Sequence, residues 1–250
     1  MEKGFINVEV LEKVATITFF HPQSNSFPSY LLEELSKTFN VLSNNQNIAV
    51  IVLQSKGKTF CSGASFNELI TINNLEEGKE FFSGFAKVIN AMRKCSKIII
   101  GKIQGKAVGG GVGLICACDF NIALNTADIK LSELTIGIGP FVIEPVITKR
   151  IGIQNFAQLT LQAKDFKSAH WAFDKGVYDK LVNSNEELDF ETEKLVKELS
   201  SYNIEALASL KQIFWKDYNH LDDLLYERAA TSGKLILSEH SKNTLSTFKK

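Results

Sequence analysis

The sequence GKAVGGGVGL, residues 105–114, decides the fold together with a second glycine-bearing turn, FCSGAS, at residues 60–65. Each turn directly follows an apolar run that is typical of a buried strand, IAVIVLQ at 48–54 and KIIIGKIQ at 97–104. Glycine lets the backbone approach a ligand without a Cβ in the way, and a helix that begins within Gly109–Gly111 adds its positive dipole end. The two turns can therefore aim two backbone N–H groups at one oxygen, as an oxyanion hole does.

Other uses of a glycine-rich turn have to be weighed against this one. Such a turn also binds phosphate or simply permits tight packing. A P-loop is disfavoured because no GKS or GKT follows, and a dinucleotide-binding turn is disfavoured because no acidic residue ends a strand about 20 residues further on. The combination of two turns with a downstream acid, Glu133, favours a catalytic interpretation over a purely structural one.

The composition is that of an ordinary globular enzyme domain. In 250 residues, 22% are charged and 44% are hydrophobic, which is enough to bury one large core. The formal net charge is zero, so the chain has no long-range attraction for nucleic acid or for an anionic membrane. A local basic patch remains compatible with this balance.

Targeting and redox signals point to the cytoplasm. Residues 1–10 alternate like a strand and lack the apolar core of roughly 7–15 residues that a signal peptide needs. The longest apolar region, residues 98–118, contains two lysines and six glycines, so it is a poor membrane span. The four cysteines show no metal-ligand spacing, so we expect small buried thiols in a reducing compartment and no metal site.

Strands and helices alternate in the first two thirds of the chain. Alternating residues predict a hairpin of strands 5–10 and 14–19, and a helix follows with Ser29 as its N-cap and Glu33 and Glu34 in its first turn. The apolar face of this helix is predicted to comprise Leu31, Leu32, Leu35, Phe39 and Leu42. A further helix is expected at about 75–93.

The last third of the chain is predicted to be helical and contains no low-complexity linker. Helices are predicted at 141–150, 155–163, 168–174, 186–200, 204–216 and 221–237. We therefore expect one domain with a helical carboxy-terminal subregion.

Motifs along most of the chain resemble those of the crotonase (enoyl-CoA hydratase/isomerase) superfamily, whose members bind acyl-CoA thioesters and stabilise the enolates made from them. The match begins with HPQSNSF at 21–27, includes both glycine turns and KLSELTIGIGPF at 130–141, and continues to DKGVYDKLV at 174–182. The resemblance implies an α/β fold, a spiral of ββα units. It implies an acyl-CoA-binding core at 1–183, and a helical region at 184–250 that belongs to the same domain and packs between subunits of a trimer or hexamer. It implies no cofactor beyond the coenzyme A of the substrate.

The same resemblance assigns roles by position. The oxyanion donors are the backbone N–H groups of Ala64 and Gly110, and Ser65 stands where hydratases usually have an aspartate. The substrate- and CoA-binding positions that the resemblance implies are Ser24, Asn25, Ser26, Phe27, Cys61, Ser62, Gly63, Ser65, Phe66, Gly109, Gly111 and Phe141.

The acid and base residues depart from the hydratase pattern. The first of the two hydratase glutamates falls at Gly113, and the second is present as Glu133. A single carboxylate is sufficient for Δ3 to Δ2 enoyl-CoA isomerisation, because it can remove a proton from C2 and return it at C4. A base of this kind needs burial to raise its pKa, and Ile136, Ile138 and Phe141 are suitable neighbours.

Two alternatives to isomerisation stay open. Glu144, in FVIEPVI, is a candidate for a relocated second acid in a hydratase for short or branched acyl chains, although a structural charge at a helix start is the favoured interpretation of this residue. A CoA-ester-binding subunit without catalysis is the other alternative. Asp119, at the end of CACD, is interpreted as structural.

Overall fold

The larger of two sheets begins with the predicted hairpin. The structure, a computed structural model, describes residues 3–247. Strands β1 (Phe5–Leu11) and β2 (Val14–Phe20) pair antiparallel, and the rest of the sheet is parallel, in the order β1-β2-β3-β5-β7-β9. The four further strands are β3 (Val50–Ser55), β5 (Ile98–Ile103), β7 (Phe120–Leu124) and β9 (Lys180–Val182).

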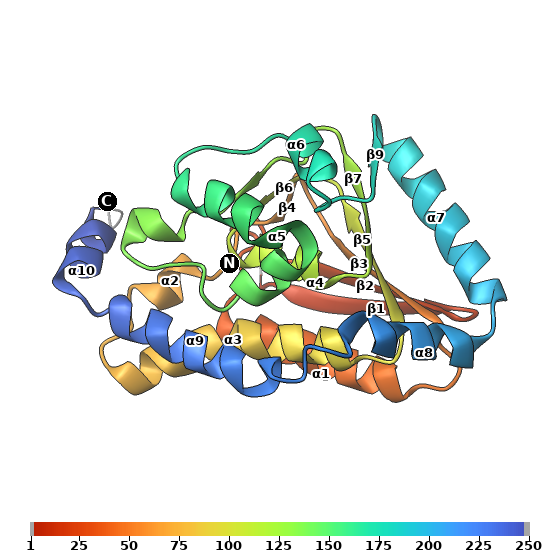
Figure 1. Ribbon diagram of the computed structural model, residues 1–250, viewed down its shortest axis with the longest axis horizontal. Coiled ribbons are helices and arrows are strands. Elements are labelled where there is room, and N and C mark those ends of the chain that lie inside the picture. Colours follow the sequence, from red (N-terminus) through yellow and green to blue (C-terminus); the bar gives the residue numbers. More distant parts are fainter. Residues whose placement is uncertain (1–2, 248–250) are drawn as a thin grey trace.

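The smaller sheet shows that the fold repeats one structural unit along the chain. Its three short parallel strands, in the order β4-β6-β8, are β4 (Thr59–Cys61), β6 (Lys106–Val108) and β8 (Ile129–Lys130). Each one follows a strand of the larger sheet and precedes a helical segment. The chain is thus an α/β fold that repeats a ββα unit (Figure 1). The strand pairs β3-β4, β5-β6 and β7-β8 each place one strand in each sheet, whereas β1 and β2 both belong to the larger sheet.

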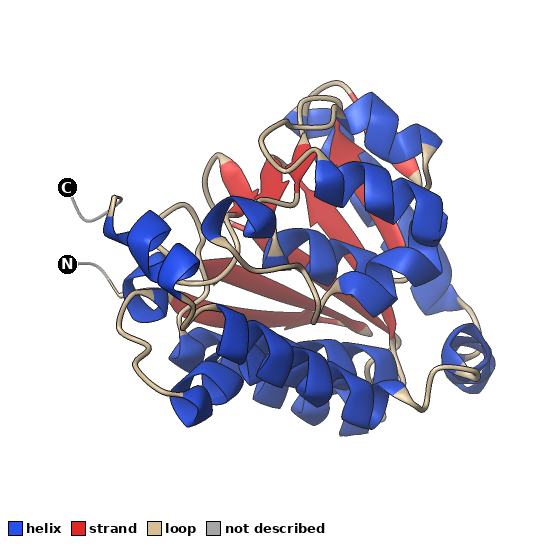
Figure 2. Cartoon of the chain, turned by 60° about the vertical axis from the view of Figure 1, so that its left-hand side comes forward, coloured by secondary structure: helices blue, strands red, loops and turns tan. Residues whose placement is uncertain are grey.

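A helical layer lies along one side of the sheets (Figure 2). Helix α1 (Ser29–Asn44) buries the five apolar residues that its periodicity predicts, and it packs against α3 (Leu75–Lys94). The prediction of Ser29 as N-cap is wrong. Pro28, in extended geometry, precedes the helix, and the backbone N–H of Ser29 donates to the Glu68 carboxylate at 2.9 Å. Consequently Glu33 and Glu34 lie outside the first turn.

The carboxy-terminal half contains the predicted helices with shifted bounds. Two of them form one element, α5 (Glu144–Leu161), with non-helical geometry at Gly152. The remaining helical elements of the described chain are α2 (Phe66–Leu69), α4 (Gly110–Ala117), the 3-10 helix η1 (Glu133–Ile136), α6 (Ala169–Asp174), α7 (Asn185–Ser201), α8 (Ile204–Trp215), α9 (Leu221–Leu235) and α10 (Glu239–Ser246). The periodicity did not indicate α10, because it is short and its first turns are polar.

Two cores hold these layers together. The main core lies between the sheets and the layer of α1, α3 and α9. A smaller cluster lies on another face of the larger sheet, where Val196 of α7 and Leu207 of α8 pack with residues of β3 and β5. None of the helices described within residues 3–247 has the length and apolar character needed to cross a bilayer.

A buried ion pair joins the carboxy-terminal helices to the sheet. The Lys211 ammonium of α8 donates to both Asp119 oxygens at 2.9 and 2.7 Å, and the side chains are only 1% and 4% exposed. Asp119 also accepts the Ile99 N–H at 2.8 Å, so its role is structural, as the sequence suggested. Removing one partner of such a pair leaves an uncompensated buried charge.

We therefore expect Lys211→Met to destabilise the fold by about 3 kcal/mol in urea unfolding. The matched control is Lys87→Met, which breaks the exposed pair with Glu80 and should cost less than about 1 kcal/mol. Equal losses in the two variants would contradict a supporting role for the buried pair.

Candidate active site

The two glycine turns pack directly against each other. Gly63 has a φ of +91°, and a Cβ built on it would lie 3.1 Å from the Val108 carbonyl oxygen and 3.6 Å from the Gly110 nitrogen. Glycine is required here for its backbone conformation and for its size. The turn after β4 is thereby brought beside the first residue of α4, as the sequence predicted for the two turns.

Both proposed donor N–H groups are free of protein partners. Phe27 forms a parallel bridge with the segment around Ala64, in which the Phe27 N–H donates to Gly63 and the Ser65 N–H donates to Phe27. Neighbouring residues in extended chain point their N–H groups to opposite sides, so the Ala64 N–H faces away from this bridge. Gly110 is the first residue of α4, where an N–H has no partner within the helix. Within residues 3–247, neither group donates to another protein atom.

The Glu133 side chain lies beside the second glycine turn but belongs to a different element. It is the first residue of η1, and a Cβ built on Gly109 would lie 2.8 Å from its Oε1. Gly109 also has a φ of +55°, which disfavours any other residue. The carboxylate therefore packs on the peptide that leads into the Gly110 N–H.

The Glu133 carboxylate is desolvated. The residue as a whole is half-buried, but Oε2 is enclosed and has no hydrogen-bond partner among the described residues. Burial raises the pKa of Glu133 to about 7. A pKa near neutrality gives access to both the basic and the acidic form, which proton transfer requires.

A cavity of about 570 Å³ joins these groups. The cavity is lined by Ala64, Gly110 and Glu133. It is also lined by all three residues proposed to desolvate Glu133, which are Ile136, Ile138 and Phe141. Among the lining residues of the described chain, Glu133 is the one titratable side chain. No group of three His, Cys, Asp or Glu side chains within residues 3–247 is placed to hold a metal ion.

The position of the missing hydratase glutamate is filled by an apolar side chain. A Cβ on Gly113 would lie 2.4 Å from Cγ2 of Ile143, which is 3% exposed and lines the cavity. A larger residue at position 113 would need Ile143 to move. The wall next to α4 is therefore hydrocarbon where a two-carboxylate site would need a charge.

Glu144 does not line the cavity. Its carboxylate accepts a hydrogen bond from Thr148 Oγ1 at 2.8 Å and lies 3.7 Å from Arg228. Ile143 and Glu144 are consecutive, so the chain directs the apolar residue into the cavity and the charged one towards α9.

The other predicted site residues divide into two groups. Those that line the cavity are Ser26, Ser62, Gly63, Phe66, Gly109 and Phe141. Those that do not are Ser24, Asn25, Phe27, Cys61, Ser65 and Gly111.

Several members of the second group support the turns instead. Asn25, with a φ of +56°, donates from its amide to the Lys56 and Thr59 carbonyls at 2.7 Å. The Ser65 hydroxyl caps α2 by accepting the Glu68 N–H. Cys61 is buried against Gly111, and burial raises the pKa of its thiol to about 12. All four cysteines are buried and unpaired in the part of the chain that the structure describes.

Sequence reasoning missed the residues that give the cavity its depth. Phe82 and Phe85 line it from α3, and Ser232 lines it from α9. The phenylalanines lie on the buried face of α3, and apolar residues in a helix indicate burial but not a ligand. Ser232 is separated from the turns by more than a hundred residues and carries no local signal.

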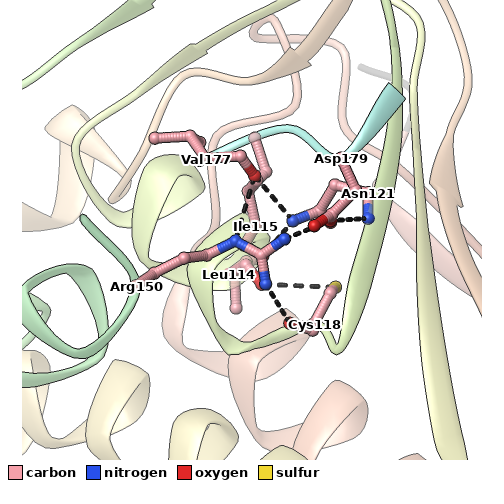
Figure 3. Close-up of polar contacts among 7 residues, drawn as sticks. All are labelled: Leu114, Ile115, Cys118, Asn121, Arg150, Val177 and Asp179. Atoms are coloured by element: carbon pink, nitrogen blue, oxygen red, sulfur yellow. Dashed lines mark hydrogen bonds and ion pairs between the residues drawn. The ribbon is translucent and has the colours of Figure 1, made fainter. Parts of the chain in front are cut away.

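A polar network anchors the far end of α4. Figure 3 shows the Arg150 guanidinium donating to the carbonyls of Cys118 and Val177 at 3.1 Å and pairing with Asp179. The Asn121 amide donates to Ile115 and Val177 at 3.0 Å. These bonds tie α4 to α5 and to the segment before β9, and so fix the helix whose first residue carries the Gly110 N–H.

Comparisons with known proteins identify the family of the chain. A family model described as enoyl-CoA hydratase/isomerase matches residues 9–250. The chain belongs to this family. Its relatives include proteins named as enoyl-CoA hydratases and a dienoyl-CoA isomerase, and the chain is an enzyme of the hydratase/isomerase family.

Named relatives in this hydratase/isomerase family include both activities. The chain is 26% identical to a probable enoyl-CoA hydratase of Bacillus subtilis, over 97% of this chain and 95% of the relative. It is 29% identical to a peroxisomal Delta(3,5)-Delta(2,4)-dienoyl-CoA isomerase of Arabidopsis thaliana, over 75% of this chain and 73% of that relative. A crystal structure of an enoyl-CoA hydratase from Bacillus halodurans superimposes with a TM-score of 0.91 at 22% identity, covering 97% of this chain and 99% of that one.

The raised pKa of Glu133 predicts a pH-dependent stability. Its pKa is about 7 in the fold and 4.5 when unperturbed, so between these values the folded chain holds a proton that the unfolded chain has lost. Stability therefore falls as the pH rises through this window, by up to about 3 kcal/mol. Glu133→Gln removes the penalty, so its stability relative to wild type should increase between pH 5 and pH 8 in urea unfolding. A difference that is the same at both pH values would contradict burial of the carboxylate.

Proposed function

We propose that this member of the enoyl-CoA hydratase/isomerase family isomerises Δ3 to Δ2 enoyl-CoA esters, with Glu133 as the single proton-transfer residue. The observation that carries the proposal is that Glu133 is the one titratable side chain among the described residues that line the cavity. Each step of the reaction then has to be performed by Glu133 and by the backbone around it.

The thioester oxygen is placed between the two free donors. The N–H groups of Ala64 and Gly110 hydrogen-bond to it, and α4 adds the positive end of its dipole. Removal of the C2 proton moves negative charge onto this oxygen, so both hydrogen bonds strengthen as the dienolate forms. Loss of one such donor typically raises the barrier by about 3 to 4 kcal/mol.

Glu133 carries the proton from one carbon to another. Its carboxylate takes the proton from C2, the double bond moves from C3–C4 to C2–C3, and the carboxylic acid returns the proton to C4. The reaction conserves all atoms and needs no water. The apolar wall to which Ile143 contributes supports such a transfer, because among the described lining residues no second acid or base competes for the proton between the two steps.

Hydration of a 2-enoyl-CoA is the second candidate. The names of relatives favour it, since the first three curated relatives are called enoyl-CoA hydratases. In this case Glu133 would activate water, and Glu144 would have to leave Thr148 and Arg228 to act as a second acid. A CoA-ester-binding subunit without catalysis is a third candidate, and it would bind CoA esters without transferring a proton.

The prediction of a homo-oligomer, a trimer or a hexamer, stays a prediction. Helix α8 supports it, because Leu210, Ile213 and Phe214 are 46%, 57% and 43% exposed in the single chain. A cytoplasmic location and the absence of a cofactor beyond the coenzyme A of the substrate belong to the same proposal.

The decisive assay follows conversion of a 3-enoyl-CoA to its 2-enoyl isomer. Glu133→Gln should lower kcat by a factor of roughly 10² to 10⁴, because it removes the general base. Glu144→Gln is the matched control and should stay within about two-fold of wild type, since the Glu144 carboxylate lies outside the cavity.

Two results would contradict the isomerase proposal. One is wild-type hydration of a 2-enoyl-CoA that Glu144→Gln abolishes, with no conversion of a 3-enoyl-CoA. The other is equal conversion by wild type and by Glu133→Gln.

A further inference from the structure

Helix α3 lines the cavity with Phe85 and Phe82. At one end, a Cβ on Gly110 would lie 2.3 Å from the ring of Phe85, so Phe85 is beside one of the two free N–H groups. Phe82 lines the cavity one turn earlier on the same helix. Towards its first turn, Gly78 meets α9. Along α3, the chain therefore connects the reacting end of the cavity, at Phe85, with the contact between Gly78 and Gly233 of α9.

Helix α9 packs antiparallel along α3 and adds Ser232 to the cavity wall. Asp222 at its start pairs with Lys94 at 2.8 Å, while Gly233 near its end touches Gly78. At this second contact a Cβ on Gly233 would lie 2.6 Å from the Gly78 carbonyl carbon, so no space is left between the helices. Ser232, the neighbour of Gly233, lines the cavity and is 1% exposed.

The two ends of the cavity differ in polarity and exposure. Gln23, Ser62 and Asn67 line it where it reaches the surface, and the first and last of these are exposed. Phe82, on the helix that packs against α9, and Leu69 also line it and are only 9% and 5% exposed. A polar pantetheine arm suits the first end, and a hydrocarbon chain suits the second.

From these contacts we infer that α3 and α9 form a ruler for the acyl chain, and that the substrates are acyl-CoA esters with chains up to about eight carbons. The inference rests on the proposed function, because it places the thioester at Ala64 and Gly110. Phe85 and Gly78 are seven residues apart, which corresponds to about 10 Å along a helix. An extended chain with bonds of about 1.5 Å advances about 1.25 Å per carbon, so about eight carbons reach Ser232.

Binding of saturated acyl-CoA esters to the wild-type protein tests this length. Calorimetry with chains from butanoyl to hexadecanoyl should show affinity rising by up to about four-fold per methylene while hydrocarbon is being buried. The rise should stop near eight carbons, where the chain meets Ser232. A steady rise beyond twelve carbons would overturn the inference.

The chain length at which the affinity stops rising is called the break. Two cavity variants should move the break in opposite directions. Ser232→Leu fills the closed end and should shift the break to chains shorter by about two carbons, while Phe82→Ala opens the wall and should shift it to longer chains. Thr231→Leu is the control, because residue 231 is the exposed neighbour on α9 and should leave the break in place. A break that neither cavity variant moves would overturn the inference.

The same titrations separate this inference from the proposed function. Binding at every length without a break would overturn the ruler and leave the proton-transfer proposal intact. Absence of binding at any length would overturn the proposed function and the ruler with it. The break in the wild-type series does not depend on the folding of either cavity variant.

Discussion

The close contact between the two glycine turns is the constraint on which the site depends. Three glycines make this contact: Gly109 and Gly110 leave no room for a Cβ towards the Glu133 carboxylate and the Phe85 ring, and a Cβ on Gly63 would lie tightly against the Val108 carbonyl. Two of the three also need a positive φ. Only this backbone contact lets two free N–H groups and one carboxylate share a cavity wall. The proposed donors belong to the backbone, so in the proposed mechanism the fold itself supplies the electrostatic part of the site.

Aromatic packing beneath the turns stabilises this arrangement. Phe19 contacts Phe27 and Phe60 with ring centroids 4.9 and 5.3 Å apart, and Phe27 contacts Phe85 at 6.3 Å. Three such pairs contribute about 3 kcal/mol beyond burial of their area. The desolvation of Glu133 costs about as much at high pH. These aromatic contacts thus offset the free-energy cost of keeping the Glu133 carboxylate buried. The contacts of Arg150 hold α4 in place at its other end.

Much of this could be predicted from local sequence. The strands before each glycine turn, the helix start at Gly110 and the burial of the α1 face follow from periodicity and from glycine chemistry. The depth of the cavity could not be predicted from local sequence. Ser232, Phe82 and Ile143 meet in one cavity only because α9 packs along α3 and the loop before α5 folds over Gly113. Ser29 misled the N-cap prediction because Glu68, from a different helix, takes its N–H.

Exchange of the Cα protons of a saturated acyl-CoA in heavy water, measured by mass spectrometry against pH, tests the central claim most directly. The reaction needs only the oxyanion donors and the base, whatever the physiological substrate is. The account predicts exchange by the wild type that increases with pH around a midpoint near 7, where Glu133 loses its proton, and no exchange by Glu133→Gln. Equal exchange by both proteins, or none by the wild type with acyl-CoA bound, would contradict it.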